Sequence, residues 1–178
     1  MARRRRKRGG RGMSWFLATV ALLVLIAGGS YLVGLERVWT LFGPADQGPI
    51  AFETLTRRAH PTDALAAPPG FGSAPADMET PRFPVAPERL AALLVAALGA
   101  EPDLTRVDDG GDPFHLRFVQ RSRVMRFPDT IDLRVMPAEG GRSSLAIYSR
   151  SQLGQADFGV NRARVERWLA AIAMAVRG

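Results

Sequence analysis

The sequence contains no cysteine and only two histidines among its 178 residues. The absence of cysteine excludes disulfides, thiol catalysis and any cysteine-ligated metal, but it leaves an oxidising compartment open. His60 and His115 lie far apart, and neither has a second histidine four residues on or a carboxylate at the spacing that zinc sites use. We therefore predict no metal site and no cofactor.

Catalytic motifs are also missing from the chain. Ser149, Ser151, Asp157 and His115 are the residue types of a serine hydrolase, but no Gly-x-Ser-x-Gly segment accompanies them. Polar side chains that satisfy one another are the simpler interpretation, and we predict no catalytic residue.

Basic residues are concentrated at the N-terminus. Seven of the 24 Lys and Arg residues lie within residues 1–12, which contain no acidic residue, and the net charge of the whole chain is also +7. Because the rest of the chain is electrically balanced, the excess charge belongs to a terminal run and not to a folded face. We therefore expect no nucleic-acid partner.

An uncharged apolar segment follows this tail. Residues 13–35 contain no charged side chain, and 23 residues at about 1.5 Å each exceed the roughly 30 Å hydrocarbon core of a bilayer. We predict a transmembrane helix in contact with the lipid bilayer, with Trp15, Tyr31 and Trp39 near its two interfaces. The basic tail, residues 1–12, is expected to stay cytoplasmic, which places the protein in the inner membrane with its C-terminal part in the periplasm.

Two other interpretations of the apolar segment stay open. The small residues at positions 27–30 are compatible with a cleaved signal peptide, although the apolar run exceeds the usual length of roughly 7 to 15 residues. A cytoplasmic nucleic-acid-binding protein would require the same segment to be a buried helix.

The proline content divides the rest of the chain. Nine of the thirteen prolines lie between residues 43 and 87, so long helices and strands are disfavoured there. We predict a tether over residues 36–49 and a periplasmic domain over residues 50–178. The proline-rich residues 50–87 are predicted to wrap this domain, because apolar residues stay frequent in them, with disorder as the alternative.

Apolar periodicity predicts the fold of the domain. A leucine stripe after Pro87 predicts a helix that ends at Gly99, and period-2 alternation predicts strands near residues 114–123, 131–135 and 143–149. Residues 105–107 are a candidate edge strand, and a second helix runs from residue 161 almost to the C-terminus. We predict an α+β fold with a three- or four-stranded antiparallel sheet and both helices on one face.

The opposite face of this sheet is predicted to be basic. It bears His115, Arg117, Arg121, Arg123, Asp132, Arg134, Tyr148 and Arg150. Such a face can bind an anionic lipid, a cell-wall polymer or a protein partner through its arginines. Alternatively it is solvated, or the proline-rich segment covers it and Arg–Asp pairs cross the strands.

The loop before the last helix concentrates polar residues. We predict Asn161 as the helix cap, which places Arg162 and Arg164 in a first turn whose dipole disfavours positive charge. Together with Arg150, this region has three guanidinium groups but only one carboxylate, that of Asp157. The loop is therefore either an anion site or an internal Arg–Asp clamp.

These two regions supply the candidate anion- or partner-binding residues. The candidates are Arg150, Ser151, Asp157, Asn161, Arg162, Arg164, Arg121 and Arg123.

Three blocks of the sequence resemble a known family. The closing block comprises Ser149-Arg150-Ser151, Gly154, Asp157, Gly159-Val160-Asn161-Arg162 and Arg164-Val165. The central block is Arg121-Ser122 with Arg126-Phe127-Pro128-Asp129, and the opening block is His60-Pro61-Thr62-Asp63-Ala64-Leu65 with Pro68. Together they are similar to the bacterial and plastid domain of unknown function 1499 over residues 50–176. The chain departs from that family at Thr62, where asparagine is expected, and in lacking a cysteine that many relatives carry. The resemblance implies a fold but no activity.

These patterns predict a membrane-anchored periplasmic module that binds an anionic partner, or assists envelope assembly, without catalysis. The alternative is an envelope hydrolase or transferase that holds an anionic substrate with Arg150, Asp157, Asn161 and Arg162.

Overall fold

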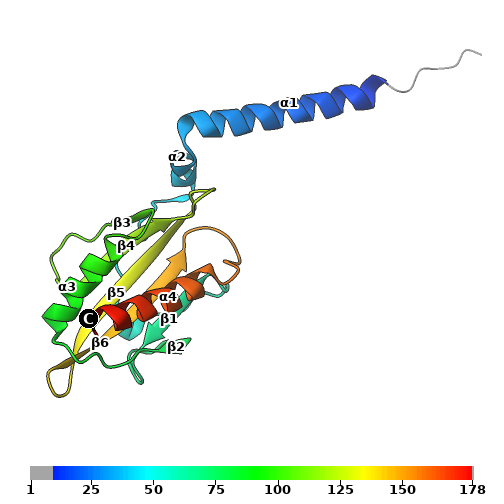
Figure 1. The fold of residues 1–178 in the computed structure, drawn as a ribbon. Helices are drawn as coiled ribbons and strands as arrows, with labels where there is room; N and C mark the ends of the chain where they lie inside the picture. Colours follow the sequence, from blue (N-terminus) through cyan, green and yellow to red (C-terminus); the bar gives the residue numbers. More distant parts are fainter. Residues whose placement is uncertain (1–9, 178) are drawn as a thin grey trace, which may run out of the picture.

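The computed structural model describes residues 10–177, which form one long N-terminal helix and one α+β domain (Figure 1). Helix α1, Gly10–Val33, is long and apolar enough to span a membrane, and it projects away from the domain. It ends at Gly34, whose φ of 87° is outside the helical region. Two short helices follow, α2 (Leu35–Trp39) and η1 (Thr40–Phe42). Most of the predicted cytoplasmic tail lies outside the described residues.

The domain is built on a six-stranded sheet, so the predicted sheet of three or four strands is too small. The strands are β1 (Asp63–Ala67), β2 (Met78–Glu79), β3 (Leu104–Arg106), β4 (His115–Arg121), β5 (Pro128–Ala138) and β6 (Arg142–Ser151). They lie in the order β2-β1-β6-β5-β4-β3. The sheet is also mixed and not purely antiparallel, because β1 and β2 run parallel. Both unpredicted strands come from the proline-rich segment.

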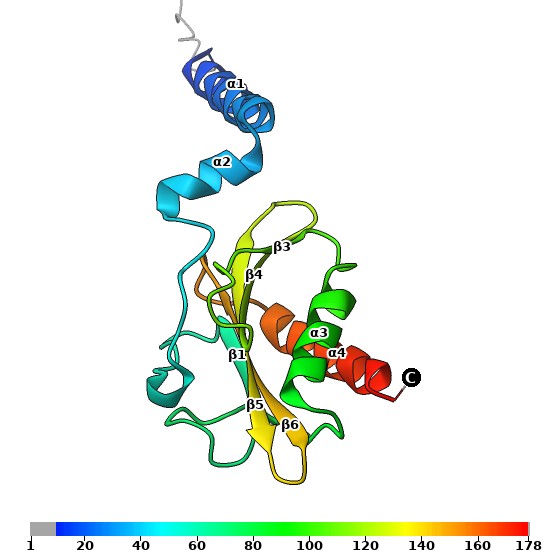
Figure 2. The ribbon, with the colours of Figure 1, turned by 90° about the vertical axis from the view of Figure 1, so that its left-hand side faces the viewer.

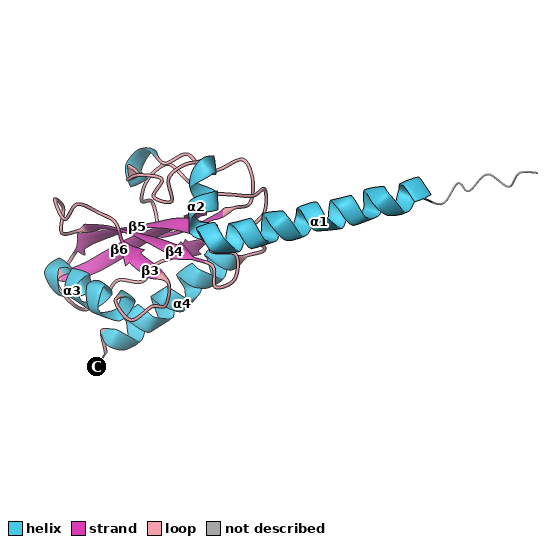
Figure 3. Cartoon of the chain, turned by 90° about the horizontal axis from the view of Figure 1, so that it is seen from above, coloured by secondary structure: helices cyan, strands magenta, loops and turns pink. Residues whose placement is uncertain are grey.

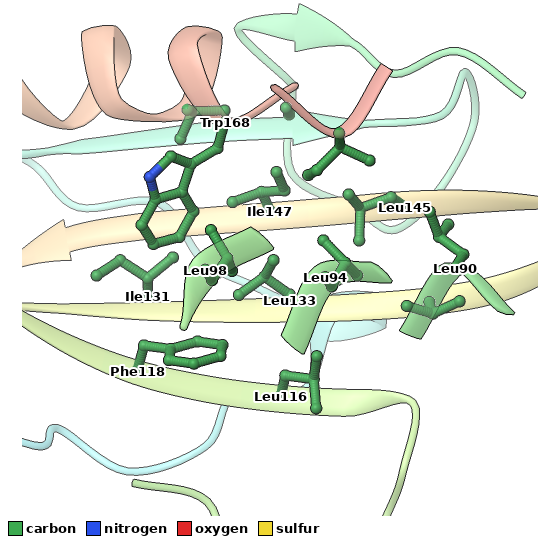
Figure 4. Packing of buried hydrophobic residues seen from close by; sticks show 14 of the residues in the cluster. Leu90, Leu94, Leu98, Leu116, Phe118, Ile131, Leu133, Leu145, Ile147 and Trp168 are labelled. Carbon is green, nitrogen blue, oxygen red and sulfur yellow. The ribbon is translucent and has the colours of Figure 1, made fainter. Parts of the chain in front are cut away.

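Two helices cover one face of the sheet, as predicted: α3 (Pro87–Leu98) and α4 (Val160–Ala175) (Figure 2). Proline is tolerated at the start of α3 because its missing N–H would have no partner in a first helical turn. Leu90 and Leu94 of α3 and Trp168 of α4 are fully buried against the sheet. Figure 4 shows these side chains in one cluster with Leu133 and Ile147, which come from β5 and β6.

The proline-rich segment covers part of the other face. This was one of the alternatives predicted for that face, the other being a solvated face. Phe52, in the 3-10 helix η2 (Phe52–Thr54), and Leu55 pack on Leu65 and Tyr148 to form a second, smaller apolar cluster. In Figure 3 the sheet lies between the helices α3 and α4 on one side and this segment on the other. The sheet is therefore the middle layer of three.

Candidate functional site

The loop between β6 and α4 is fixed by Asp157. Its carboxylate accepts hydrogen bonds from the backbone N–H of Gly159 at 2.9 Å and of Asn161 at 3.0 Å, two amides at the start of α4. Gly159 itself is left-handed, with a φ of 80°. The prediction that Asn161 caps the helix is therefore wrong. Asp157 satisfies the free amides instead, and Asn161 lies inside the first turn.

The Asn161 side chain is fully buried and connects three segments of the chain. Its Oδ1 accepts hydrogen bonds from Ser149 Oγ and Arg164 Nη1, both at 2.6 Å. Its Nδ2 donates to Ser151 Oγ at 2.9 Å and to the carbonyl oxygen of Thr62 at 3.1 Å. Each polar atom of this amide is satisfied internally, so it is part of the scaffold.

Two of the candidate arginines, Arg150 and Arg164, are buried in ion pairs. Arg164 Nη2 donates to Asp129 Oδ2 at 2.6 Å, and Arg164 Nε donates to Gln120 Oε1 at 2.5 Å. Arg150 Nη1 donates to Asp132 Oδ2 at 2.7 Å. Asp129 and Asp132, and not Asp157, therefore supply the counter-charges of these guanidinium groups. This arrangement agrees with the clamp interpretation of the loop, with different acidic partners.

The remaining loop candidates do not converge on a shared site. Ser151 is buried beside Asn161. Arg162 is exposed and forms an i,i+4 ion pair with Glu166. The distance between Arg162 Nε and Glu166 Oε1 is 3.0 Å. An external anion at this loop would have to displace buried aspartates, which makes the loop a poor anion receptor.

Ion pairs and a histidine–carboxylate contact also cross the second sheet face. Arg117 Nε donates to Asp46 Oδ1 at 2.8 Å, and His115 Nε2 lies 3.0 Å from Asp132 Oδ1. Asp46 belongs to the segment predicted as a tether, so residues 36–49 contact the domain. Arg134 pairs in the same way with Asp112.

Asp63 and Tyr148 form a further polar pair under the wrapping segment. The Tyr148 hydroxyl donates to Asp63 Oδ2 at 2.5 Å, and Arg57 Nη2 donates to Asp63 Oδ1 at 2.9 Å. Burial alone would raise the pKa of Asp63, but the hydrogen bonds from Arg57 and Tyr148 outweigh it and hold that pKa below its ordinary value. Burial and the neighbouring carboxylate raise the pKa of Tyr148, so its hydroxyl stays a donor.

Two other candidates, Arg121 and Arg123, line an open cleft of about 510 Å³ together with Gln120, Arg167, Glu101, Pro102 and Asp103, which we call the basic cleft. The Arg121 Nε lies 3.2 Å from Glu36 Oε2, while its Nη1 is buried and has no hydrogen-bond partner within residues 10–177.

The other charged side chains of the basic cleft differ in whether they have an ion-pair partner. Arg167 pairs with Glu101, and Asp103 pairs with Arg126, outside the cleft. For Arg123, the described part of the chain offers no ion pair or side-chain hydrogen bond. Of the candidates, Arg121 and Arg123 are therefore the two that line a cleft and have unused hydrogen-bonding capacity, since Arg162 lies on the exposed surface beside Glu166.

A second depression, of about 480 Å³, lies between η1 and the loop that leads into α4. We call it the apolar groove, because most of its lining is apolar, with Trp39, Phe42, Phe127, Leu153, Phe158 and Val160. Sequence reasoning missed this site. The available signal was the presence of Leu153 and Phe158 in a loop otherwise made of glycine, alanine and polar residues.

No three His, Asp or Glu side chains lie close enough to hold a metal ion in the described residues. The acidic groups instead bind arginines and backbone amides, as described above.

Comparison with known proteins identifies one family. Its model, described as a protein of unknown function (DUF1499), matches residues 60–172, which include every strand of the sheet and most of α4. No curated protein matches the chain.

Proposed function

The chain belongs to the DUF1499 family of proteins of unknown function, and we propose that it is a membrane-anchored, non-catalytic module that binds an anionic partner. The partner classes we consider are an anionic lipid, a cell-wall polymer and an acidic protein surface. All three present phosphate or carboxylate groups, which arginine recognises through paired hydrogen bonds.

The first part of the proposal is the location. Helix α1 crosses the inner membrane, the basic residues 1–12 stay in the cytoplasm, and the domain lies in the periplasm. The length and apolarity of α1 and the seven basic residues on its N-terminal side support this location. Every described side chain in the 18-residue apolar stretch of α1 is outside the protein core, as expected for a helix that faces lipid.

The observation that carries the binding role is the basic cleft. Arg121 has a buried Nη1 without a partner within residues 10–177, and a buried donor in this state is stabilised when it meets an acceptor. Arg123 adds a second guanidinium to the lining of the same cleft. An anionic group that enters the cleft beside Arg121 and Arg123 leaves the buried ion pairs of the fold in place.

A catalytic role is less well supported. An envelope hydrolase or transferase that used Arg150, Asp157, Asn161 and Arg162 would need these groups to face a substrate. Arg150, Asp157 and Asn161 are engaged in internal hydrogen bonds, and Arg162 is paired with Glu166 on the outside of α4.

The binding role can be tested with inorganic pyrophosphate as a simple anionic probe. Full-length protein in phosphatidylcholine nanodiscs is titrated by calorimetry, beside the double variant Arg121→Gln/Arg123→Gln. We expect the double variant to bind at least about tenfold more weakly, because a hydrogen bond to a charged group contributes about 1.5–3 kcal/mol. The matched control is Arg162→Gln, which removes an exposed arginine outside the cleft and is expected to bind like the wild type. Equal affinities for all three proteins would refute the binding role.

The location is tested separately by adding protease to spheroplasts. The C-terminal domain is expected to be digested from outside while residues 1–12 stay protected. Protection of the domain in intact spheroplasts would show that it is cytoplasmic, and the orientation would then be wrong.

A further inference from the structure

We infer that the apolar groove holds an acyl chain of a lipid from the bilayer that α1 crosses. The inference rests on the proposed membrane anchorage and adds the chemical class of the partner, an anionic lipid. The volume of the apolar groove, about 480 Å³, is within the range of roughly 300–1,000 Å³ that is typical of small-molecule sites.

Aromatic side chains form one wall of the apolar groove. The ring centroids of Trp39 and Phe127 are 4.5 Å apart, and those of Trp39 and Phe42 are 6.2 Å apart. Trp39 Nε1 donates to the carbonyl oxygen of Met125 at 2.6 Å, so the polar atom of the indole is satisfied away from the groove. This wall therefore presents hydrocarbon to an occupant.

The loop before α4 forms the opposite wall. Leu153, Phe158 and Val160 line it, and Phe158 is 97% exposed while Val160 is 52% exposed. The two charged residues at the groove, Asp129 and Asp157, are already bound by Arg164 and by the amides of α4, and the hydroxyls of Ser122 and Ser151 accept hydrogen bonds from the Phe127 amide and from Asn161. Apolar surface exposed to water has an unfavourable free energy. An apolar ligand that covers this surface is therefore favoured.

The position of the groove selects a membrane lipid as the occupant. Trp39 and Phe42 follow the end of α1 by only six and nine residues, so the aromatic wall is carried by the segment that leaves the membrane. The opposite wall, the orange loop in Figure 1, lies on the side of the domain toward which α1 projects. Tryptophan is enriched at membrane interfaces, because its ring is apolar and its N–H is polar. An acyl chain therefore has a short path from the bilayer into the groove.

The backbone of Phe158 gives an independent reason to expect a ligand here. Its φ of 54° lies in the left-handed region, which a bulky side chain occupies at a cost in conformational energy. The same ring makes almost no contact within the domain, so packing does not offset that cost. Strained residues of this kind concentrate at ligand sites, where the bound ligand makes the compensating contacts.

The basic cleft is placed to receive the headgroup of the same lipid. Arg164 donates to Gln120, which lines the basic cleft, and to Asp129, which lines the apolar groove. Arg164 therefore contacts one lining residue of each site. A phosphate group beside Arg121 and Arg123 with an acyl chain beside Phe158 matches an anionic phospholipid.

The test is photo-crosslinking of full-length protein in bilayers that contain phosphatidylglycerol with a diazirine on one acyl chain. We expect crosslinks on two peptides, one from α1 and one from residues 151–162. The double variant Phe158→Asp/Val160→Asp removes two apolar groove residues and is expected to lose at least four fifths of the crosslinks on residues 151–162. It is expected to fold, because aspartate tolerates the left-handed region and suits the first turn of a helix. The matched control Met174→Asp changes an exposed apolar residue at the other end of α4 and is expected to crosslink like the wild type.

A filling variant distinguishes an occupied groove from a loop that merely touches lipid. Ala156→Phe keeps the groove apolar but occupies part of its volume, and we expect it to reduce the crosslinks on residues 151–162 at least twofold. If Ala156→Phe crosslinks as much as the wild type, the acyl chain does not enter the groove and the inference fails.

Absence of crosslinks on residues 151–162 of the wild type, with those on α1 intact, refutes the lipid site alone. Absence of both refutes the membrane anchorage. Dimers that Val160→Asp dissociates would show that a second copy covers the groove, which also overturns the inference.

Discussion

Arg164 Nη2 donates to Asp129 Oδ2 at 2.6 Å, and the two side chains are only 7% and 12% exposed. A buried charge that loses its partner destabilises a protein by about 3–5 kcal/mol. We therefore expect Asp129→Asn to lower the free energy of unfolding by about 3 kcal/mol, measured by denaturant unfolding of the full-length protein in detergent micelles.

The double variant Arg164→Met/Asp129→Leu is the control for this pair, since it removes both charges. The double variant leaves neither charge unpaired, so we expect it to lose less stability than the sum of the losses of Arg164→Met and Asp129→Leu, although Gln120 and Asn161 each lose a donor in it. A double variant at least as unstable as the sum of its single variants would contradict the role of the pair as a mutually dependent unit.

Asn161 is expected to be one of the most sensitive positions of the fold. Asn161→Ala leaves the buried hydroxyls of Ser149 and Ser151 and the carbonyl of Thr62 with fewer partners. Each unsatisfied buried group costs about 1–3 kcal/mol, so we expect a loss of about 3 kcal/mol in the free energy of unfolding. The neighbouring variant Arg162→Ala removes an exposed i,i+4 pair and is expected to change stability by less than about 0.5 kcal/mol. Similar losses for both would show that Asn161 is not a structural link.

Acid is expected to weaken the domain partly through Asp108. Burial opposes ionisation of Asp108, but hydrogen bonds from the Arg106 guanidinium and the Arg117 amide outweigh it and lower its pKa from 3.8 to about 2. Because the folded-state pKa is the lower one, the stabilisation is present above the unfolded-state pKa of 3.8 and is lost as the pH falls from about 5 to about 2. One pKa unit equals about 1.4 kcal/mol, so the loss is about 2 kcal/mol.

The measurement is the melting temperature of the wild type and of Asp108→Asn between pH 7 and pH 2. The variant is expected to be less stable at pH 7 and to lose less stability on acidification, so the two curves approach each other near pH 2. Parallel curves over the whole range would contradict the assignment to Asp108.

The elements that could be predicted from the sequence are those with a regular apolar period. The α3 helix matches its prediction in both bounds, because Pro87 and Gly99 mark its ends and leucines recur on one face. Strand β1 was missed because Leu65 and Ala67 face one apolar cluster while Ala64 and Ala66 face the other, so no polar alternation marks it. Strand β2 has only two residues and depends on pairing with β1.

The sequence predicted which residues lie at the candidate site, but not which acidic residues pair with its arginines. Arg150, Arg162 and Arg164 were expected to need a counter-charge, and Asp157 is the acid that lies between them in sequence. The actual partners depend on strand register, which places Thr130 opposite Arg150 and Asp129 opposite Ser151. Period-2 patterns give the face on which a residue lies, but not its neighbours on the adjacent strand. The apolar groove was not predictable from local patterns either, because Trp39 and Phe42 are more than 100 residues away in sequence from Leu153 on the opposite wall.

The proline-rich segment provides the last prediction, through two glycines with nearly the same backbone. Gly70 and Gly72 have φ values of 72° and 75°, so alanine at either position is strained by about 1–2 kcal/mol. They differ in their surroundings. A Cβ on Gly70 meets no atom within 4 Å, whereas a Cβ on Gly72 would lie 2.5 Å from the carbonyl oxygen of Phe52. That contact joins the loop before β2 to η2, over the second sheet face.

We therefore expect Gly70→Ala to cost about 1 kcal/mol and Gly72→Ala about 3 kcal/mol, since the second variant adds a steric clash to the same backbone strain. Only Gly72→Ala is expected to make residues 50–76 sensitive to limited proteolysis, because relief of the clash has to lift Phe52 from Leu65 and Tyr148. Unfolding measurements and mass spectrometry of the cleavage products test the two expectations. Equal losses of stability and equal cleavage would mean that the wrapping segment does not pack on the sheet, since backbone strain alone would then account for both variants.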